Sequence, residues 1–475
     1  MIVALNKRAM GRGGSVDYKA IVIGTGQGGK PLAGAFAVAK WNTAIVECGD
    51  VGGTCVNVGC TPTKTMVASA RVAYLARRGR EYGVECSDME INLQTVRERK
   101  RKIVDMFRGG SERGMTRHET LELIRGTASF TGPKTLSVAL NDGGTREIRS
   151  DKIFINAGTR PLIPDIEGLS KTPYLTSTTI MELGEVPEHL LVIGGGYIGV
   201  ECGQMFRRFG SEVTIIQRGK SLLGREDEDV AAEVLKILTE DGVKVILEAR
   251  PLGVSGSENR GVEVTFKSHT GEKTLSGSHL LVSVGRVSNA DTLNLSASGI
   301  ETDSRGNIKV NDKLETSASG VWALGDVNGG PAFTHISYDD FRVLKANIID
   351  GGDANTSGRL VPYCVYTDPQ LGRVGLTERQ AKEQGLNYRV AKIPMTHVAR
   401  ALEMDETRGF MKAIVDADTE QILGAAVLGI EGGEVMSVLQ MAMMGKVPYT
   451  TVRDGVFAHP TLAESLNNLF MAMDG

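Results

Sequence analysis

Short apolar runs that end at glycine-rich turns occur at two places in the chain. Residues 19–23 and 190–193 are dominated by apolar side chains and are too short for a helix, so we expect buried strands there. Each run leads into G-x-G-x-x-G, a helical stretch and a second apolar strand that ends at Glu47 in the first copy and at Gln217 in the second, at equal spacing from the first glycine. The pattern predicts two strand–turn–helix–strand repeats of a parallel, doubly wound sheet.

The glycines of these turns point to dinucleotide binding. In this motif the first glycine permits a tight turn, the second lets backbone amides approach a pyrophosphate, and the third lets the helix pack closely on the strand. These glycines are Gly24, Gly26 and Gly29 in the first repeat and Gly194, Gly196 and Gly199 in the second. One such motif alone could be an ordinary turn, but two in full context predict two dinucleotide-binding, Rossmann-like domains.

The remaining pattern is richer in strands. Residues 127–149 alternate around turns and end at an apolar strand, 152–155, and residues 262–284 repeat this plan after the second motif. From about residue 360, longer strands, a hairpin around 416–418 and two late helical stretches predict a third, α+β domain.

Composition and charge narrow the class of protein. The chain has 475 residues, of which 41% are hydrophobic and 23% charged, as expected for a globular protein of about three domains. Its net charge of -3 favours no nucleic acid and no membrane surface as a partner, and no apolar run is long enough to span a bilayer. Six cysteines are too few for a disulfide scaffold and the first residues lack a secretory pattern, so we expect a cytoplasmic protein with a flexible basic extension at residues 1–17.

Cys55 and Cys60 form the one close cysteine pair in the sequence. The other cysteines are scattered and no histidine is near, so we expect no metal site. Thr61 reads as an N-cap and Pro62 as the first helical residue, which places Cys60 at a helix N-terminus, where a thiolate is favoured. Since five residues of ideal helix exceed the reach of a disulfide, the chain around Gly59 must leave regular helix if the two sulfurs bond. Two inert buried thiols are the alternative.

These motifs together resemble a known family. The two glycine turns, GGTCVNVGC at 52–60, GGGYIGVE at 194–201, ALGD at 323–326 and AHPTLAE at 458–464 are similar to the class I pyridine nucleotide-disulfide oxidoreductases, which include dihydrolipoamide dehydrogenase, glutathione reductase and mercuric reductase. The resemblance spans residue 18 to the end. It implies an FAD domain (18–160 and 290–355), an NAD(P) domain (161–289), an interface domain (356–475) and a homodimer.

The resemblance also implies catalytic roles. Cys60 would be the charge-transfer thiol beside the flavin and Cys55 the interchange thiol that meets the acceptor. Lys64 would pair with Glu201 near the flavin N5, although both could be solvated helix charges. His459 would be the acid/base for Cys55 in the other subunit, oriented by Glu464; a capping box from Thr461 to Glu464 is a purely structural alternative for that acid.

Cofactor residues follow in the same way. Glu47 would bind the FAD ribose, Asp326 the ribityl chain, and Tyr197 would cover the nicotinamide pocket. Gln217 and Arg218 stand where a carboxylate would select NADH, so we expect NADPH, with NADH possible. The further residues that the resemblance places at the two cofactors are Gly53, Thr54, Lys64, Gly158 and Gly285.

The sequence leads to one favoured reaction. Electrons would pass from NADPH through FAD to a Cys55–Cys60 disulfide and on to a small acceptor, foremost a metal ion such as Hg(II) or Cu(II), as in mercuric reductase-like enzymes. Mercury handling is in question, because those enzymes end in a cysteine pair and this sequence has no cysteine after Cys364. A low-molecular-weight disulfide reductase and a flavin-bearing interaction subunit are the alternatives.

Overall fold

The computed structural model describes residues 16–86, 89–257 and 260–473 and divides into two compact units. Unit 1 contains residues 1–57, 104–160 and 286–358, and unit 2 contains residues 58–103, 161–285 and 359–475. The expected extension at residues 1–17 lies mostly outside the described residues. Its last two residues form β1 (Val16–Asp17), which pairs with β6 (Thr145–Arg149), so the expectation of a flexible extension is wrong at these two residues.

Unit 1 is built on one eight-stranded sheet with the order β1-β6-β5-β4-β3-β2-β7-β17. Strands β2, β3, β4, β7 and β17 run parallel, whereas β4, β5 and β6 form an antiparallel meander that continues the sheet. The bounds of the other strands are β2 (Ala20–Ile23), β3 (Thr43–Glu47), β4 (Leu121–Gly132), β5 (Thr135–Leu140), β7 (Ile153–Ile155) and β17 (Val321–Ala323).

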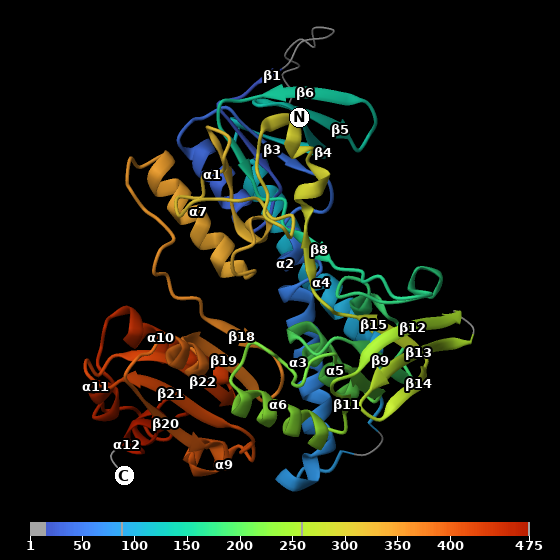
Figure 1. The fold of residues 1–475 in the computed structure, drawn as a ribbon, viewed down its shortest axis with the longest axis vertical. Coiled ribbons are helices and arrows are strands. Elements are labelled where there is room, and N and C mark those ends of the chain that lie inside the picture. Colours follow the sequence, from blue (N-terminus) through green and yellow to red (C-terminus); the bar gives the residue numbers. More distant parts are fainter. Residues whose placement is uncertain (1–15, 87–88, 258–259, 474–475) are drawn as a thin grey trace. The chain divides into compact units, whose positions relative to one another are not determined.

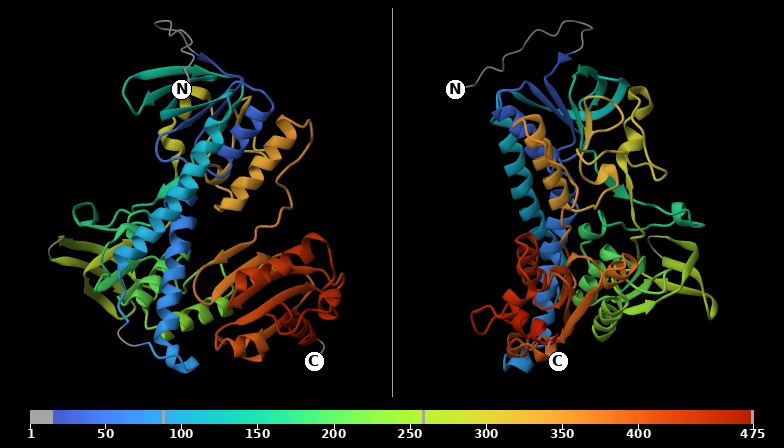
Figure 2. Two further views of the ribbon diagram at one scale, coloured as in Figure 1. Left: turned by 180° about the vertical axis from the view of Figure 1, so that it is seen from behind. Right: turned by 60° about the vertical axis from the view of Figure 1, so that its left-hand side comes forward.

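Both faces of this sheet are covered. Ala20 and Val22 point into a cluster shared with α1 (Gly29–Val38) and α7 (Thr334–Ile348), while Ile21 and Ile23 point into a second cluster with the meander and residues 290–327. Helices α1 and α7 lie side by side in Figures 1 and 2. Because strands covered on both faces are apolar throughout, β2 has no polar positions.

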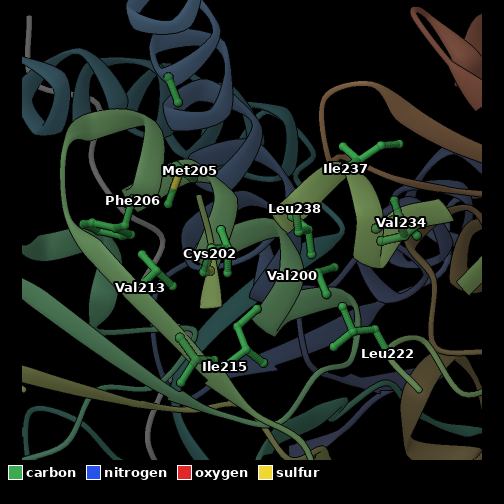
Figure 3. Packing of buried hydrophobic residues seen from close by; sticks show 14 of the residues in the cluster. Val200, Cys202, Met205, Phe206, Val213, Ile215, Leu222, Val234, Ile237 and Leu238 are labelled. Atoms are coloured by element: carbon green, nitrogen blue, oxygen red, sulfur yellow. The ribbon is translucent and has the colours of Figure 1, made fainter. Parts of the chain in front are cut away.

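Unit 2 contains a second parallel sheet, of order β11-β10-β9-β15, and a three-stranded antiparallel sheet, β12-β13-β14. Figure 3 shows Val200 and Cys202 from α5 (Tyr197–Phe209), Ile215 from β10 and Val234 from α6 (Glu228–Glu240) in the core of the first sheet. The strand bounds are β9 (His189–Ile193), β10 (Glu212–Ile216), β11 (Lys244–Ile246), β12 (Arg250–Ser257), β13 (Gly261–Ser268), β14 (Gly271–Gly277) and β15 (His279–Val282).

The C-terminal part of unit 2 is a five-stranded antiparallel sheet of order β18-β19-β22-β21-β20. Helix α10 (Gly432–Met444) packs on β19 and β22, and α12 (Ser465–Met471) packs on β20 and β21 (Figure 1). The strands are β18 (Tyr363–Val365), β19 (Gln370–Gly375), β20 (Tyr388–Pro394), β21 (Phe410–Asp416) and β22 (Ile422–Gly429), with short helices α8 (Glu378–Glu383), α9 (Ala399–Glu403) and α11 (Tyr449–Arg453). The expected hairpin at 416–418 is present.

Two of the remaining helices contain the cysteines of the close pair, Cys55 and Cys60. α2 (Gly53–Asn57) belongs to unit 1, α3 (Cys60–Arg77) to unit 2, and α4 (Leu93–Thr116) contributes to both. The mixed α/β architecture with two Rossmann-like sheets and an α+β domain confirms the expected fold class. Single-turn 3-10 helices lie at Gly79–Tyr82, Leu169–Lys171, Ile180–Glu182, Asn289–Thr292, Leu295–Ser298, Gly325–Asn328 and Met395–His397, and the short strands β8 (Thr159–Pro161) and β16 (Arg286–Ser288) form a two-stranded sheet.

Candidate active site

The first glycine turn is closed by contacts that tolerate no side chain. Gly24 has φ +98°, and a Cβ there would lie 2.4 Å from the carbonyl oxygen of Asn156. A Cβ on Gly29 would lie 2.2 Å from the carbonyl oxygen of Gly24, so the third glycine lets α1 pack onto the turn itself. Gly26 has a further constraint that the sequence did not predict, because a Cβ there would lie 2.6 Å from the Asn156 side-chain oxygen.

Asn156 is the residue of this turn that sequence reasoning missed. Its Oδ1 accepts a hydrogen bond from the Gly29 amide at 2.9 Å, and its Nδ2 donates to the Leu324 carbonyl at 2.7 Å. It follows β7 directly, so its position after a buried strand was the one available signal. Asn156 ties the start of α1 to the end of β17.

The second turn repeats the first in detail. Gly194 has φ +109°, and a Cβ on Gly199 would lie 2.0 Å from the Gly194 carbonyl oxygen. The Thr25 amide donates to Glu47 Oε2 at 2.9 Å, and at the matching place the Gly195 amide donates to Gln217 Oε1 at 3.1 Å. Glu47 and Gln217 are therefore structurally equivalent, as their spacing predicted.

The residues expected at FAD are held by unit 1. Glu47 is almost fully buried, and its Oε1 accepts from the Gly49 amide at 2.9 Å. The Asp326 carboxylate accepts from Thr159 Oγ1 at 3.1 Å, and burial raises the pKa of Asp326, a shift that nearby Arg286 opposes. Gly53 has φ +66°, Thr54 is exposed beside it on α2, and Gly158 has φ +67° with open space around its Cβ position.

The two cysteines lie on separate helices. Cys55 is in α2 and Cys60 is the first residue of α3, with Gly59 between them at φ -129°, ψ -116°. The expected break in the helix is present. The expected cap is wrong: Gly59 rather than Thr61 is the N-cap, and Pro62 is buried in the first turn, because the non-helical Gly59 starts the helix earlier.

Lys64 and Glu201 form an ion pair within unit 2. Lys64 Nζ lies 2.7 Å from Glu201 Oε2, with side chains 31% and 8% exposed, and the second carboxylate oxygen accepts from the Tyr366 amide at 2.7 Å. Burial alone would lower the pKa of Lys64, but the Glu201 carboxylate outweighs it, so the pKa is raised. The two side chains are in contact although they lie far apart in the sequence. Neither is a solvated helix charge.

Tyr197, the first residue of α5, contacts the buried carboxylate of Glu226. Glu226 Oε1 accepts from the Tyr363 hydroxyl at 2.6 Å and from the Tyr197 hydroxyl at 3.4 Å. Glu226 and Arg373 are both buried, with Arg373 Nε 4.0 Å from Glu226 Oε2. Burial raises the pKa of Glu226. No sequence pattern predicted this cluster, because its members come from three distant segments.

The cationic residues beside Gln217 differ in their surroundings. Arg218 is exposed, and no ion pair of it is found among residues 16–86, 89–257 and 260–473. Lys220 is bound to Glu228 at 3.0 Å. Gly196 has open space where a Cβ would be, and Gly285, at φ +141°, follows β15.

His459 and Glu464 meet as expected. His459 Nδ1 lies 2.9 Å from Glu464 Oε2, and the histidine side chain is 67% exposed. The Glu464 amide donates to Thr461 Oγ1 at 3.2 Å, which is half of the expected capping box; the carboxylate itself is used by His459. The last helix starts at Ser465 with Glu464 as its N-cap, so the expectation that the Thr461 capping box opens this helix is wrong.

The part of the chain that the structure describes contains neither a membrane-spanning helix nor a cluster of metal ligands. No helix there is long and apolar enough to cross a membrane. No group of three or more His, Cys, Asp or Glu side chains there could hold a metal ion.

Comparisons with known proteins agree with this geometry. The sequence profile of pyridine nucleotide-disulphide oxidoreductases matches residues 18–340, and the profile of their dimerisation domain, which supports a homodimer, matches residues 361–470. The chain is 38% identical over 457 residues to the pyridine nucleotide-disulfide oxidoreductase RclA of Escherichia coli, covering 95% of this chain and 98% of that protein. It is 34% identical to a mercuric reductase of Bacillus cereus, covering 97% and 72%.

A solved structure has the same fold. The Cu(II) complex of the HOCl-induced flavoprotein disulfide reductase RclA from Escherichia coli superposes with a TM-score of 0.87 at 37% identity, covering 96% of this chain and 99% of that one. This family uses FAD and NAD(P)H. The chain therefore belongs to the class I pyridine nucleotide-disulfide oxidoreductases and is a flavoprotein enzyme.

Proposed function

We propose that this enzyme passes electrons from NADPH through FAD to a Cys55–Cys60 disulfide, whose dithiol form reduces a metal ion, foremost Cu(II). The proposal rests on the position of α2, the helix that contains Cys55. A Cβ on Gly53, at the start of α2, would lie 2.8 Å from the Cα of Gly26. Cys55 is two residues further along, so the helix that carries this cysteine begins in contact with the first nucleotide turn.

The residues of unit 1 fit FAD. Glu47 stands at the carboxyl edge of the parallel sheet, and its carboxylate accepts hydrogen bonds from donors that include the Thr25 amide, the Thr25 hydroxyl and the Gly49 amide. A carboxylate fixed in this way suits ribose hydroxyls, and the turn before α1 suits a pyrophosphate. When bound there, FAD would supply the two-electron chemistry that links the nicotinamide to the disulfide.

The protein's own residues would handle the charges. Lys64 and Glu201 would form a fixed ion pair beside the flavin ring. His459, oriented by Glu464, would carry the proton that the Cys55 sulfur gains or loses, in the other subunit of the homodimer. A test of the sulfur roles is Cys60→Ser, which we expect to abolish the long-wavelength absorption of the two-electron-reduced enzyme; retention of that band would overturn the role of Cys60.

The choice of NADPH rests on Arg218. Its guanidinium is exposed beside Gln217, whose uncharged amide does not repel a 2′-phosphate. We expect Arg218→Met to raise KM for NADPH about tenfold or more and to leave KM for NADH nearly unchanged. Lys220→Met is the matched control, because Lys220 is bound to Glu228. Equal effects of the two variants would contradict the assignment.

The choice of Cu(II) rests on the likeness to the E. coli flavoprotein that was solved as a Cu(II) complex. The electrons balance: the two thiolates lose two electrons and form the disulfide, while two Cu(II) become two Cu(I). The mercuric reductase likeness keeps Hg(II) as a second candidate, and the description of the E. coli protein as a disulfide reductase keeps small disulfides as a third.

One panel separates these acceptors. The purified holoenzyme is supplied with NADPH and with Cu(II), Hg(II), lipoamide or glutathione disulfide, and both NADPH oxidation and Cu(I) formation are followed. We expect Cu(II)-dependent turnover that Cys55→Ser abolishes and Cys86→Ser, a change at an exposed cysteine outside the pair, leaves intact. Faster turnover with a disulfide, or Cu(I) formation that survives Cys55→Ser, would overturn the proposal.

A further inference from the structure

A lysine occupies an unusual place beside the first nucleotide turn. Lys30 is the second residue of α1, and its amide donates to the Gly26 carbonyl at 3.1 Å. Its ammonium reaches across to α4 and donates to the Ser111 hydroxyl at 3.0 Å. Lys30 lines a cavity of about 620 Å³ between α1 and α4.

The surroundings of Lys30 supply no carboxylate. Its recorded partner among the described residues is the neutral, buried Ser111. The acids of neighbouring segments are engaged elsewhere: Asp50 binds Arg108 at 2.9 Å, and Glu112 binds Arg125. Half-burial of a cation without a counter-charge costs free energy, and the pKa of Lys30 is accordingly lowered by burial.

Cys55, when ionised, would oppose this effect. A charged Cys55 acts on the Lys30 ammonium and raises its pKa, against the larger effect of burial. The geometry is consistent, since Gly53 of α2 touches Gly26 and the Gln27 side chain donates to the Gly52 carbonyl at 3.3 Å. Both contacts hold α2, with Cys55, against the start of α1.

We propose that Lys30 is a positioning residue whose ammonium stabilises the Cys55 thiolate once the disulfide has been reduced. Attraction between opposite charges is reciprocal, so a cation that is stabilised by the thiolate favours the thiolate equally. The other charged or titratable groups near this region are Arg108, paired with Asp50, and Arg117 and His118, which follow α4 and contact each other. The inference rests on the proposed role of Cys55 as the interchange thiol.

The test measures the reactivity of Cys55 directly. In a Cys60→Ser background, the flavin-loaded protein is alkylated with iodoacetamide from pH 5.5 to 9, and modification of the Cys55 peptide is followed by mass spectrometry. We expect Lys30→Gln, which keeps a donor for Ser111 but removes the charge, to slow alkylation at pH 6.5 about fivefold and to move the pH midpoint upward. Lys30→Arg should restore most of the rate, because it restores the charge.

A matched control separates this effect from a general change of charge. Lys40 is exposed just beyond the other end of α1, about 15 Å from Lys30 at 1.5 Å per helical residue, so Lys40→Gln should leave the midpoint unchanged. Equal midpoints for Lys30→Gln and Lys40→Gln would overturn the inference, as would failure of Lys30→Arg to restore the rate. If Lys30→Gln does not fold, Lys30→Met is measured in the same way.

Turnover keeps this inference distinct from the proposed function. In the protein with both cysteines, Lys30→Gln should slow reoxidation by the acceptor and leave flavin reduction by NADPH unchanged. If the two-electron-reduced wild-type enzyme shows no charge-transfer band, the redox role of the cysteine pair is refuted. A normal band together with an unshifted Cys55 midpoint in Lys30→Gln would refute the role of Lys30 alone.

Discussion

Removal of Lys64 should destabilise the fold more than removal of the whole ion pair. Loss of one partner of a fully buried pair costs about 3–5 kcal/mol, because the other charge is left buried without compensation. Lys64 is 31% exposed and Glu201 still accepts the Tyr366 amide, so water and this hydrogen bond relieve part of the cost. We expect Lys64→Met to lower the free energy of unfolding by about 2 kcal/mol.

The double variant provides the decisive comparison. Lys64→Met with Glu201→Gln has no buried charge and keeps an acceptor for the Tyr366 amide, so we expect it to regain at least half of the lost stability. Urea denaturation of the flavin-loaded proteins, followed by circular dichroism, gives the midpoints. A double variant that is no more stable than Lys64→Met would refute the argument from an uncompensated carboxylate.

The pH dependence gives an independent check. Because pairing raises the pKa of Lys64 in the folded protein, its contribution is fully present below the unfolded value, about 10.4, and is lost as pH rises through the folded value. The difference between wild type and Lys64→Met should therefore stay constant from pH 6 to 9 and shrink only above about pH 10. A difference that vanishes near neutral pH would point to another group.

Three further outcomes follow from the structure. Burial raises the pKa of Glu226, so ionisation of its carboxyl group opposes folding; the stability of Glu226→Gln relative to wild type, from urea midpoints, should therefore increase from about pH 4.3 to pH 8, and a difference that does not change with pH would contradict this. Gly196→Ala should fold normally yet raise KM for NADPH, which steady-state kinetics can measure. Gly194→Ala should lose about 2 kcal/mol of stability in thermal melts, because Gly194 has φ +109° and the new Cβ would lie 2.6 Å from the Ser283 carbonyl oxygen. His459→Asn should slow acceptor reduction about 100-fold and spare flavin reduction by NADPH, which stopped-flow absorbance can test.

The duplicated turn could be predicted residue by residue because its constraints are local. Gly24 and Gly194 are required by positive φ and by a carbonyl oxygen at their Cβ positions, and such constraints leave a fixed spacing in the sequence. The start of α3 was misplaced, because Thr61 and Pro62 form a good capping pattern that the non-helical backbone of Gly59 overrides.

Contacts between distant segments could not be obtained in this way. The Lys64–Glu201 and His459–Glu464 pairs were expected from family resemblance alone, and the structure brings both together. Asn156 at the first turn, the Glu226–Arg373 cluster and the Lys30–Ser111 contact had no sequence signal, because each depends on how separate strands and helices pack.

The equivalence of Glu47 and Gln217 bears on how such enzymes change over evolution. Each side chain satisfies the backbone amide of its own turn through one carboxyl or amide oxygen, which glutamate and glutamine share. An exchange between the two at position 217 would therefore leave the scaffold intact while it alters the charge presented to the coenzyme. Selectivity for one reductant pool or the other can drift in this lineage by single substitutions, without a compensating mutation elsewhere.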